Sequence, residues 1–371
     1  MRKIIGTLAA AGIAAAPHLL LAATPPAIAS LSDTLNAWGV TMNGYVAGSY
    51  YASNGYPFNI HQFDTQHNTF QLDEAGLQVG YQPTQGFGGY VDMITGTDAR
   101  ILHIAEDGQP SAFDARQAFI QYADGPVTVI AGKFVTLAGA ETMNPTTDTN
   151  ISRSLLFTEA EPLDHTGVRA TVALTKTFSF ILGVNNGWNT TSTSYGSKTG
   201  ETGIAWTPDQ YFSLSTSGYY GKMLPFNAAR SLIDVVATYN ATSALTFIAN
   251  FDWDQQAEAT GPGTPTATWD GLALYANYQF DPQWRVSLRG EYLDDKNGFI
   301  TGAIDGQHLW EGTVTFGYAP TTHFELRLEG RYDASQTAFF YRSNPANATA
   351  TNLPLMADNV SQIALQGVLK F

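Results

Sequence analysis

The chain has 371 residues, of which 13% are charged and 12% aromatic, and it contains 35 glycines and no cysteine. Its mean hydropathy of −0.11, and the absence after residue 29 of any apolar run of about 18 residues, exclude a bundle of transmembrane helices. A formal net charge of −14 argues against nucleic acid as a partner, and without cysteine the fold must be stable without disulfides.

Residues 1–29 are typical of a cleaved secretory signal peptide. Arg2 and Lys3 precede a run built mostly of Ala, Ile and Leu, and the small residues that end at Ala29 suit cleavage after that position. The alternative is a membrane anchor, but prolines leave too little unbroken apolar length for a stable span. Cleavage would remove two positive charges and no negative ones, which changes the formal net charge from −14 to −16. This acidity either keeps loops soluble or biases the protein toward cations.

Residues 30–371 repeat one pattern, in which two runs of alternating apolar and polar residues are joined by a tight turn and followed by a longer stretch. The seven tight turns lie at 82–86, 124–126, 175–177, 208–210, 240–243, 281–283 and 320–322. The eight longer segments lie near 52–68, 96–112, 137–163, 187–199, 221–229, 255–267, 295–306 and 336–357. This alternation predicts a single all-β domain after a short lead-in at 30–36. We expect a transmembrane antiparallel up-and-down β-barrel of about sixteen strands, with short periplasmic turns and long extracellular loops.

The segment 137–165 is the longest connection and a candidate constriction loop. It contains Ile151, Leu155 and Phe157, whose apolar side chains favour packing over exposure to solvent. A barrel of this size has room for the segment inside, and the alternative is an external lid. Folded inward, its carboxylates would face lumen-lining cations and create a transverse field that filters solutes. The carboxylates are Glu141, Asp148, Glu159 and Glu161, and the cations are Lys133, Arg169, Arg285, Arg289, Arg327 and Arg331.

Two predicted strands separate their faces clearly. In 284–292 the polar and charged residues share one face and Trp284, Leu288 and Tyr292 lie on the other, and 324–332 follows the same rule. The polar face of each strand would line a water-filled lumen, and the apolar face would contact lipid.

The segment 114–122 departs from this regular alternation. Its Arg116 shares parity with Ile120 and Tyr122, which would place a charge on the apolar face. Either a β-bulge or a position at the extracellular rim is therefore needed.

The last nine residues, 363–371, also alternate and end in an aromatic residue. Leu365, Gly367, Leu369 and Phe371 share one face. A terminal Phe would fray in a soluble protein, whereas the last strand of a membrane barrel must pair with the first to close the sheet. This ending resembles the assembly signal of bacterial outer-membrane proteins, and we expect it to pair with a first strand at 38–50.

The loop motif resembles a known family. The motif comprises Asn144-Pro145, Asn150-Ile-Ser-Arg-Ser154 and Phe157, followed by Asp164-His-Thr-Gly-Val-Arg169 at the start of a strand. It is similar to the pattern of the putative beta-barrel porin family 2 of Gram-negative bacteria, and the resemblance covers nearly the whole chain after residue 29. The resemblance implies a passive outer-membrane pore without an assigned solute. It gives Arg153 a structural or constriction role and makes Asp164 and His165 candidate anchors at the loop base.

We therefore expect an outer-membrane porin with a water-filled channel for passive diffusion of small hydrophilic solutes or ions. Its partners would be outer-membrane lipid, lipopolysaccharide and the barrel-assembly machinery, and a homotrimer would suit a general porin although no residue pattern indicates one. No catalytic residue, cofactor or metal site is expected, because the six histidines after residue 29 are scattered and no hydrolase, zinc-protease or phosphate-loop motif is present. Acidic pairs such as Asp294-Asp295 and Glu159/Glu161 lack the spacing of calcium ligands. The alternatives are a non-conducting adhesin or structural barrel and a hydrolase with catalytic residues on the barrel rim.

Overall fold

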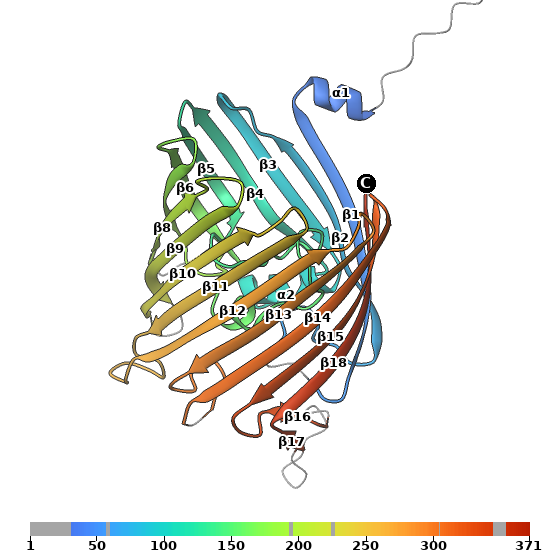
Figure 1. Ribbon diagram of the computed structural model, residues 1–371. Helices are drawn as coiled ribbons and strands as arrows, with labels where there is room; N and C mark the ends of the chain where they lie inside the picture. The colour runs from blue at the N-terminus through green and yellow to red at the C-terminus, as the bar shows by residue number, and fades with distance from the viewer. Residues whose placement is uncertain (1–30, 57–59, 193–195, 224–226, 304, 344–353) are drawn as a thin grey trace, which may run out of the picture.

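The computed structural model describes residues 31–56, 60–192, 196–223, 227–303, 305–343 and 354–371. The expected signal peptide at 1–29 lies outside these residues, as do short parts of the expected long connections. The described part of the chain forms a closed antiparallel barrel of sixteen strands, together with three helices and a two-stranded hairpin (Figure 1). The predicted fold class and strand number are confirmed.

The barrel strands run in chain order around the ring, so each pairs with its neighbours in sequence. They are β1 (Val40–Ser53), β2 (Thr69–Tyr81), β3 (Gly86–Thr95), β4 (Phe113–Asp124), β5 (Val127–Val135), β6 (Asp164–Ala173), β7 (Phe178–Asn185), β8 (Thr199–Trp206), β9 (Phe212–Met223), β10 (Ala228–Asn240), β11 (Leu245–Gln256), β12 (Ala267–Gln279), β13 (Trp284–Asp295), β14 (Gln307–Thr321), β15 (Phe324–Ser335) and β18 (Asn359–Lys370). Each predicted tight turn joins two of these strands, because turn-forming residues interrupt the alternation there.

The remaining elements belong to the ends and the long connections. They are α1 (Leu31–Ala37), α2 (Thr97–Asp107), α3 (Leu155–Glu159) and the hairpin of β16 (Phe340–Tyr341) and β17 (Met356–Ala357). Figure 1 shows α1 and the C terminus at one end of the barrel and the hairpin at the other. The described helices include none that is long and apolar enough to cross a lipid bilayer.

The seam between the first and last strands follows the predicted pairing. β1 and β18 are antiparallel from Tyr45 opposite Lys370 to Ser53 opposite Gln362. β18 pairs with β15 on its other edge, so both edges of the sheet are joined. A closed ring leaves no strand edge with unpaired backbone groups facing lipid.

The two faces of the barrel carry different side chains, as the alternation predicts. On β15, Leu328 and Tyr332 are about half exposed on the outer surface, whereas Arg327, Glu329 and Arg331 point inward and are buried. Exposed aromatic residues also mark strand ends around the barrel, as in the girdles of membrane barrels. They include Trp38, Phe70, Phe87, Tyr122, Tyr220, Tyr239, Trp284, Tyr292, Trp310 and Tyr332.

A β-bulge resolves the irregular parity of β4. Asp92 of β3 lies opposite Gln117 and Met93 lies opposite Ala115, so Arg116 is the extra residue. Arg116 is therefore buried inside while Ile120 is exposed on the outer face. Of the two explanations considered from the sequence, the bulge is the one observed.

Candidate functional site

The backbone of 145–153 is held by arginines that project inward from β13 and β15. Each of four guanidinium groups donates a hydrogen bond to a different carbonyl oxygen of this stretch. The bonds are Arg327 to Pro145 (2.9 Å), Arg285 to Thr149 (2.7 Å), Arg289 to Ser152 (2.9 Å) and Arg331 to Arg153 (2.6 Å). The segment 137–165 therefore passes through the interior of the barrel along this wall.

Two glutamates of the same wall accept hydrogen bonds from the segment. Glu329 receives the N–H groups of Ile151 (2.6 Å) and Ser152 (2.9 Å). Glu291 receives the N–H of Leu155 at 2.8 Å, at the start of α3. The wall thus supplies donors for carbonyls and acceptors for N–H groups, so the buried backbone of 145–155 is hydrogen-bonded without belonging to a β-sheet.

Apolar side chains fix the segment as well. Leu155 and Leu156 are fully buried in a cluster that includes Trp269 and Leu293. On the other side of the segment, Phe157 packs in a second cluster with Leu102 of α2. The packing of Leu155 and Phe157 agrees with the expectation that the apolar side chains of this segment are not exposed to solvent.

The carboxylates of the segment have different surroundings. Glu141 pairs with Arg289 of β13 at 2.6 Å, and among the described residues this is the one ion pair between the four expected carboxylates and an expected wall cation. Asp148 pairs with Arg153 of the same segment at 3.1 Å. Glu159 is partly exposed, and Glu161 is buried without a basic partner among the described residues.

Arg153 mainly organises its own segment. Its guanidinium donates to the carbonyls of Thr142 (2.7 Å), Ile151 (2.9 Å) and Met143 (3.3 Å). It also lies over the ring of Phe63 at 5.3 Å. The side chain is 2% exposed, so it ties the two arms of the segment together from within.

The base of the segment is buried. Asp164 lies 4.0 Å from the ammonium of Lys133, and His165 Nδ1 is 3.0 Å from the carbonyl oxygen of Gly187. The His165 ring stacks on Tyr219 with centroids 4.9 Å apart. Nearby, Arg169 forms two hydrogen bonds with Glu201 of β8, at 2.5 and 2.8 Å.

A cavity of about 270 Å³ lies on the side of the segment that faces β2–β5. Its strand-borne lining comprises the polar residues Gln78, Asp92, Arg116 and Gln117 and the apolar Val135. The segment contributes both polar and apolar residues, namely Leu137, Ala138, Gly139, Glu141, Thr142, Met143, Asn144, Thr147, Phe157 and Leu163. Open volume therefore remains between the segment and β2–β5.

The sequence did not single out these strand residues as site residues. Arg116 and Asp92 belong to one buried network, in which Arg116 bonds to Asp92 (2.9 Å) and Glu74 (3.0 Å). The bulge reverses which residues of β4 point inward. The inward-facing residues of this strand can therefore be predicted only if the position of the bulge is known.

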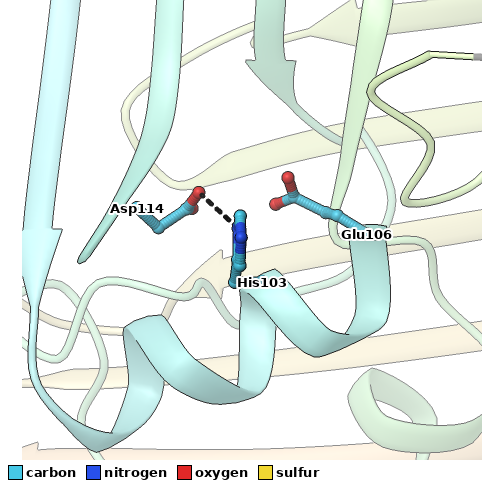
Figure 2. Close-up of side chains that lie close together, drawn as sticks. All are labelled: His103, Glu106 and Asp114. Atoms are coloured by element: carbon cyan, nitrogen blue, oxygen red, sulfur yellow. Dashed lines mark ion pairs between the residues drawn. The ribbon is translucent and has the colours of Figure 1, made fainter. Parts of the chain in front are cut away.

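Two groups of acidic and histidine side chains come close enough to suggest metal ligands. In the first, His103 and Glu106 project from α2 toward Asp114 of β4 (Figure 2). The ammonium of Lys133 contacts Glu106 and lies 3.2 Å from Asp114, so this group already has a cation of its own. The second group is Glu161, Asp234 and Asp252.

Comparison with known proteins places this architecture among bacterial outer-membrane barrels. A family model described as "Putative beta-barrel porin-2, OmpL-like" matches residues 39–362. In-vitro folded OmpT of Vibrio cholerae, in its trimer form, is similar with a TM-score of 0.62 and 10% identity over 90% of this chain and 99% of that one. No curated protein sequence matches the chain.

Two further structures are similar over the same share of the chain. The outer membrane channel DcaP of Acinetobacter baumannii has a TM-score of 0.60 and 13% identity, and covers 90% of this chain and 97% of its own. The anion-selective porin from Comamonas acidovorans has a TM-score of 0.61 and 11% identity, with coverage of 90% and 99%. At these identities the likeness is one of fold.

Proposed function

The chain belongs to the Putative beta-barrel porin-2, OmpL-like family, and from this membership we propose that it conducts small hydrophilic solutes or ions passively across the outer membrane. The observation that carries the proposal is the attachment of the segment 137–165 to the inside of the barrel. Four arginines and two glutamates hold it against β13 and β15. A segment fixed inside a barrel narrows the lumen without abolishing it when space remains on the opposite side.

The route for solutes follows from the position of that space. The cavity beside β2–β4 is bounded by the side chains of Gln78, Asp92 and Gln117 on the wall and Asn144 and Thr147 on the segment. Apolar side chains such as Met143 and Phe157 line the cavity as well. The amides, hydroxyls and carboxylate are the groups that can replace water molecules around a hydrophilic solute. We place the narrowest part of the pathway here.

Single-channel recording in a planar bilayer tests the proposal. Purified folded protein should give stepwise currents, and replacement of 141–160 by a short glycine-serine linker should raise the conductance. The same linker in place of 259–264, in the loop between β11 and β12, is the control and should leave the conductance unchanged. An absence of stepwise current would exclude a porin. An unchanged conductance after removal of 141–160 would exclude constriction by this segment.

The cellular setting is part of the proposal. Export of the chain by a signal peptide at 1–29 would bring it to the outer membrane of a Gram-negative bacterium, where lipid, lipopolysaccharide and the barrel-assembly machinery would be its partners. A homotrimer is proposed because OmpT of Vibrio cholerae is described in a trimer form. Chemical crosslinking of the protein in outer membranes tests this, with a ladder that ends at three copies as the expected result.

No hydrolytic activity is included in this function. The rings of five histidines bond to carboxylates, backbone groups or a tyrosine, and none of these five bonds to a serine hydroxyl. They are His61, His67, His165, His308 and His323. A hydrolase with a serine nucleophile needs such a pair of nucleophile and base, and the contacts of these five histidines do not provide one.

A further inference from the structure

Three carboxylates from separate elements meet inside the barrel. Glu161 follows α3, Asp234 lies on β10 and Asp252 lies on β11. Each offers an oxygen atom that lies within 4.8 Å of an oxygen of both other residues. Glu161 is 6% exposed, and Asp234 and Asp252 are fully buried. The group therefore joins the segment 137–165 to the barrel wall.

The group has no positive partner among the described residues. No ion pair of those residues includes Glu161, Asp234 or Asp252, and the other charges that act most strongly on Glu161 are those of Glu141 and Glu291, also carboxylates. Both oxygens of Glu161 and one oxygen of Asp252 lack a hydrogen-bond donor. Three buried like charges at this separation repel one another strongly unless a cation or shared protons neutralise them.

The neighbouring polar groups fix the position of Asp234, whereas no N–H or hydroxyl group of the described residues donates to the Glu161 carboxylate. Asp234 accepts hydrogen bonds from the N–H of Gly139 (3.1 Å), the side chain of Asn250 (2.9 Å) and the hydroxyl of Ser217 (3.2 Å). At Gly139, φ is +91° and a Cβ atom would lie 1.9 Å from Glu161 Oε2. Only glycine allows the backbone at position 139 to pass so close to the Glu161 carboxylate. The segment therefore encloses this carboxylate beside Asp234 and Asp252.

The first group, around His103, provides the contrast. Glu106 and Asp114 of that group (Figure 2) share the ammonium of Lys133, so the protein itself supplies a positive charge to them. No lysine or arginine of the described residues takes this position at Glu161. The two groups thus differ in whether a basic side chain lies beside the carboxylates. Where none does, an added cation can supply the missing positive charge.

We propose that Glu161, Asp234 and Asp252 bind one divalent cation of the calcium type, which fastens the segment 137–165 to β10 and β11. Calcium prefers carboxylate and other oxygen ligands and tolerates irregular geometry, and this group offers oxygens alone. The bound ion attaches the C-terminal arm of the segment to β10 and β11, whereas the arginines of β13 and β15 hold the stretch 145–153. Binding then stabilises the folded barrel, because the unfolded chain does not bring the three carboxylates together.

Calcium titration of the refolded full-length protein, after treatment with EDTA and its removal, tests this assignment. Isothermal calorimetry should give one site with a dissociation constant below about 1 mM, and calcium should raise the thermal midpoint of unfolding. Glu161→Gln and Asp252→Asn should each weaken binding at least about tenfold and abolish the thermal shift. Glu106→Gln removes a carboxylate from the Lys133 group and should leave both measurements unchanged.

The substitutions at Glu161 and Asp252 relieve repulsion between carboxylates, so the variant proteins should fold. The heat-dependent mobility of the barrel on gels checks this. Equal calcium affinity in the wild type and in a Glu161→Gln/Asp252→Asn double variant would overturn the assignment. An absence of binding by the wild type up to about 1 mM calcium would also overturn it and would indicate that shared protons neutralise the group. Single-channel activity does not enter either measurement, so the two proposals can fail independently.

Discussion

Phe371 and Gly44 exchange two backbone hydrogen bonds, one from the N–H of Phe371 to the oxygen of Gly44 at 2.9 Å and one in the reverse direction at 2.8 Å. The Phe371 ring lies over Gly44, where a Cβ atom would come within 2.3 Å of ring atom Cε2. The terminal residue of the chain therefore extends the β1–β18 seam by one more pair. The glycine is needed there because the aromatic ring occupies the space of its missing side chain.

Disruption of this pair should impair assembly more than conduction. Deletion of Phe371, or Gly44→Val, should lower the fraction of protein that becomes heat-modifiable in outer membranes, while the folded remainder keeps its single-channel conductance. Gly312→Val in β14 is the matched control, because a Cβ at Gly312 would meet nothing within 4 Å. A folded fraction equal to that of the wild type in the Gly44 variant would contradict the prediction.

Arg289 should be the most costly of the wall arginines to replace. It pairs with Glu141 (2.6 Å), Glu291 (2.9 Å) and Glu311 (3.0 Å) and also bonds to the segment backbone at Ser152. Arg289→Met would leave three carboxylates without this partner and should lower the free energy of unfolding by about 3 kcal/mol. Urea unfolding in detergent micelles measures this.

Arg285 provides the control for that experiment. Its side chain is 14% exposed, and it pairs with one carboxylate, that of Glu325. Arg285→Met should therefore cost less stability than Arg289→Met, because fewer charges lose their partner and water can reach them. Equal losses of unfolding free energy in the two variants would show that the ion pairs of Arg289 stabilise the barrel no more than the single ion pair of Arg285 does.

The strands were predictable because their signal is local. Alternation places Arg327 and Glu329 on the opposite face from Leu328, whatever the rest of the barrel does. Tight turns such as the one before Val127 are marked by their own residues. The number of strands and the closing of β18 on β1 follow from these local patterns and from the need to pair every edge.

The interior contacts were less predictable because they join residues far apart in the sequence. Charge alone suggested that Asp148 and Glu161 would face wall cations, yet Asp148 pairs within the segment and Glu161 lies beside Asp234 and Asp252. Parity tells which side chains point inward but not the height or the angle at which they meet. The sequence predicts 96–112 only as a long connection, whereas the structure forms α2 at Thr97–Asp107.

Cysteine accessibility should locate the solute pathway. The protein has no cysteine, so single cysteines can be introduced without background reaction. Thr147 is exposed at the cavity. Modification of a Thr147→Cys variant by a charged, membrane-impermeant thiosulfonate should therefore reduce single-channel conductance. Ser287→Cys on β13 is the control, because Ser287 is fully buried and should not react. Modification at 147 without any change of current would place the pathway elsewhere.

His61 should make the stability of the barrel depend on pH. Its Nδ1 is 2.5 Å from Asp64 and its Nε2 is 3.2 Å from Asp333 of β15. Burial and the charge of Arg331 lower the pKa of His61, but Asp64 and Asp333 outweigh both, and the pKa is raised above its ordinary value. The charged ring thus holds the connection between β1 and β2 to the inside of the wall.

Because the pKa is higher in the folded state, the stabilisation by His61 is complete below about pH 6.5 and is lost as the pH rises through the raised value. The thermal midpoint, followed by circular dichroism, should fall between about pH 6 and pH 9 by more in the wild type than in His61→Asn. His323→Asn is the control, because the His323 ring is exposed and bonds to the carbonyl of Lys370. Equal falls in the wild type and in His61→Asn would assign the pH dependence to other groups.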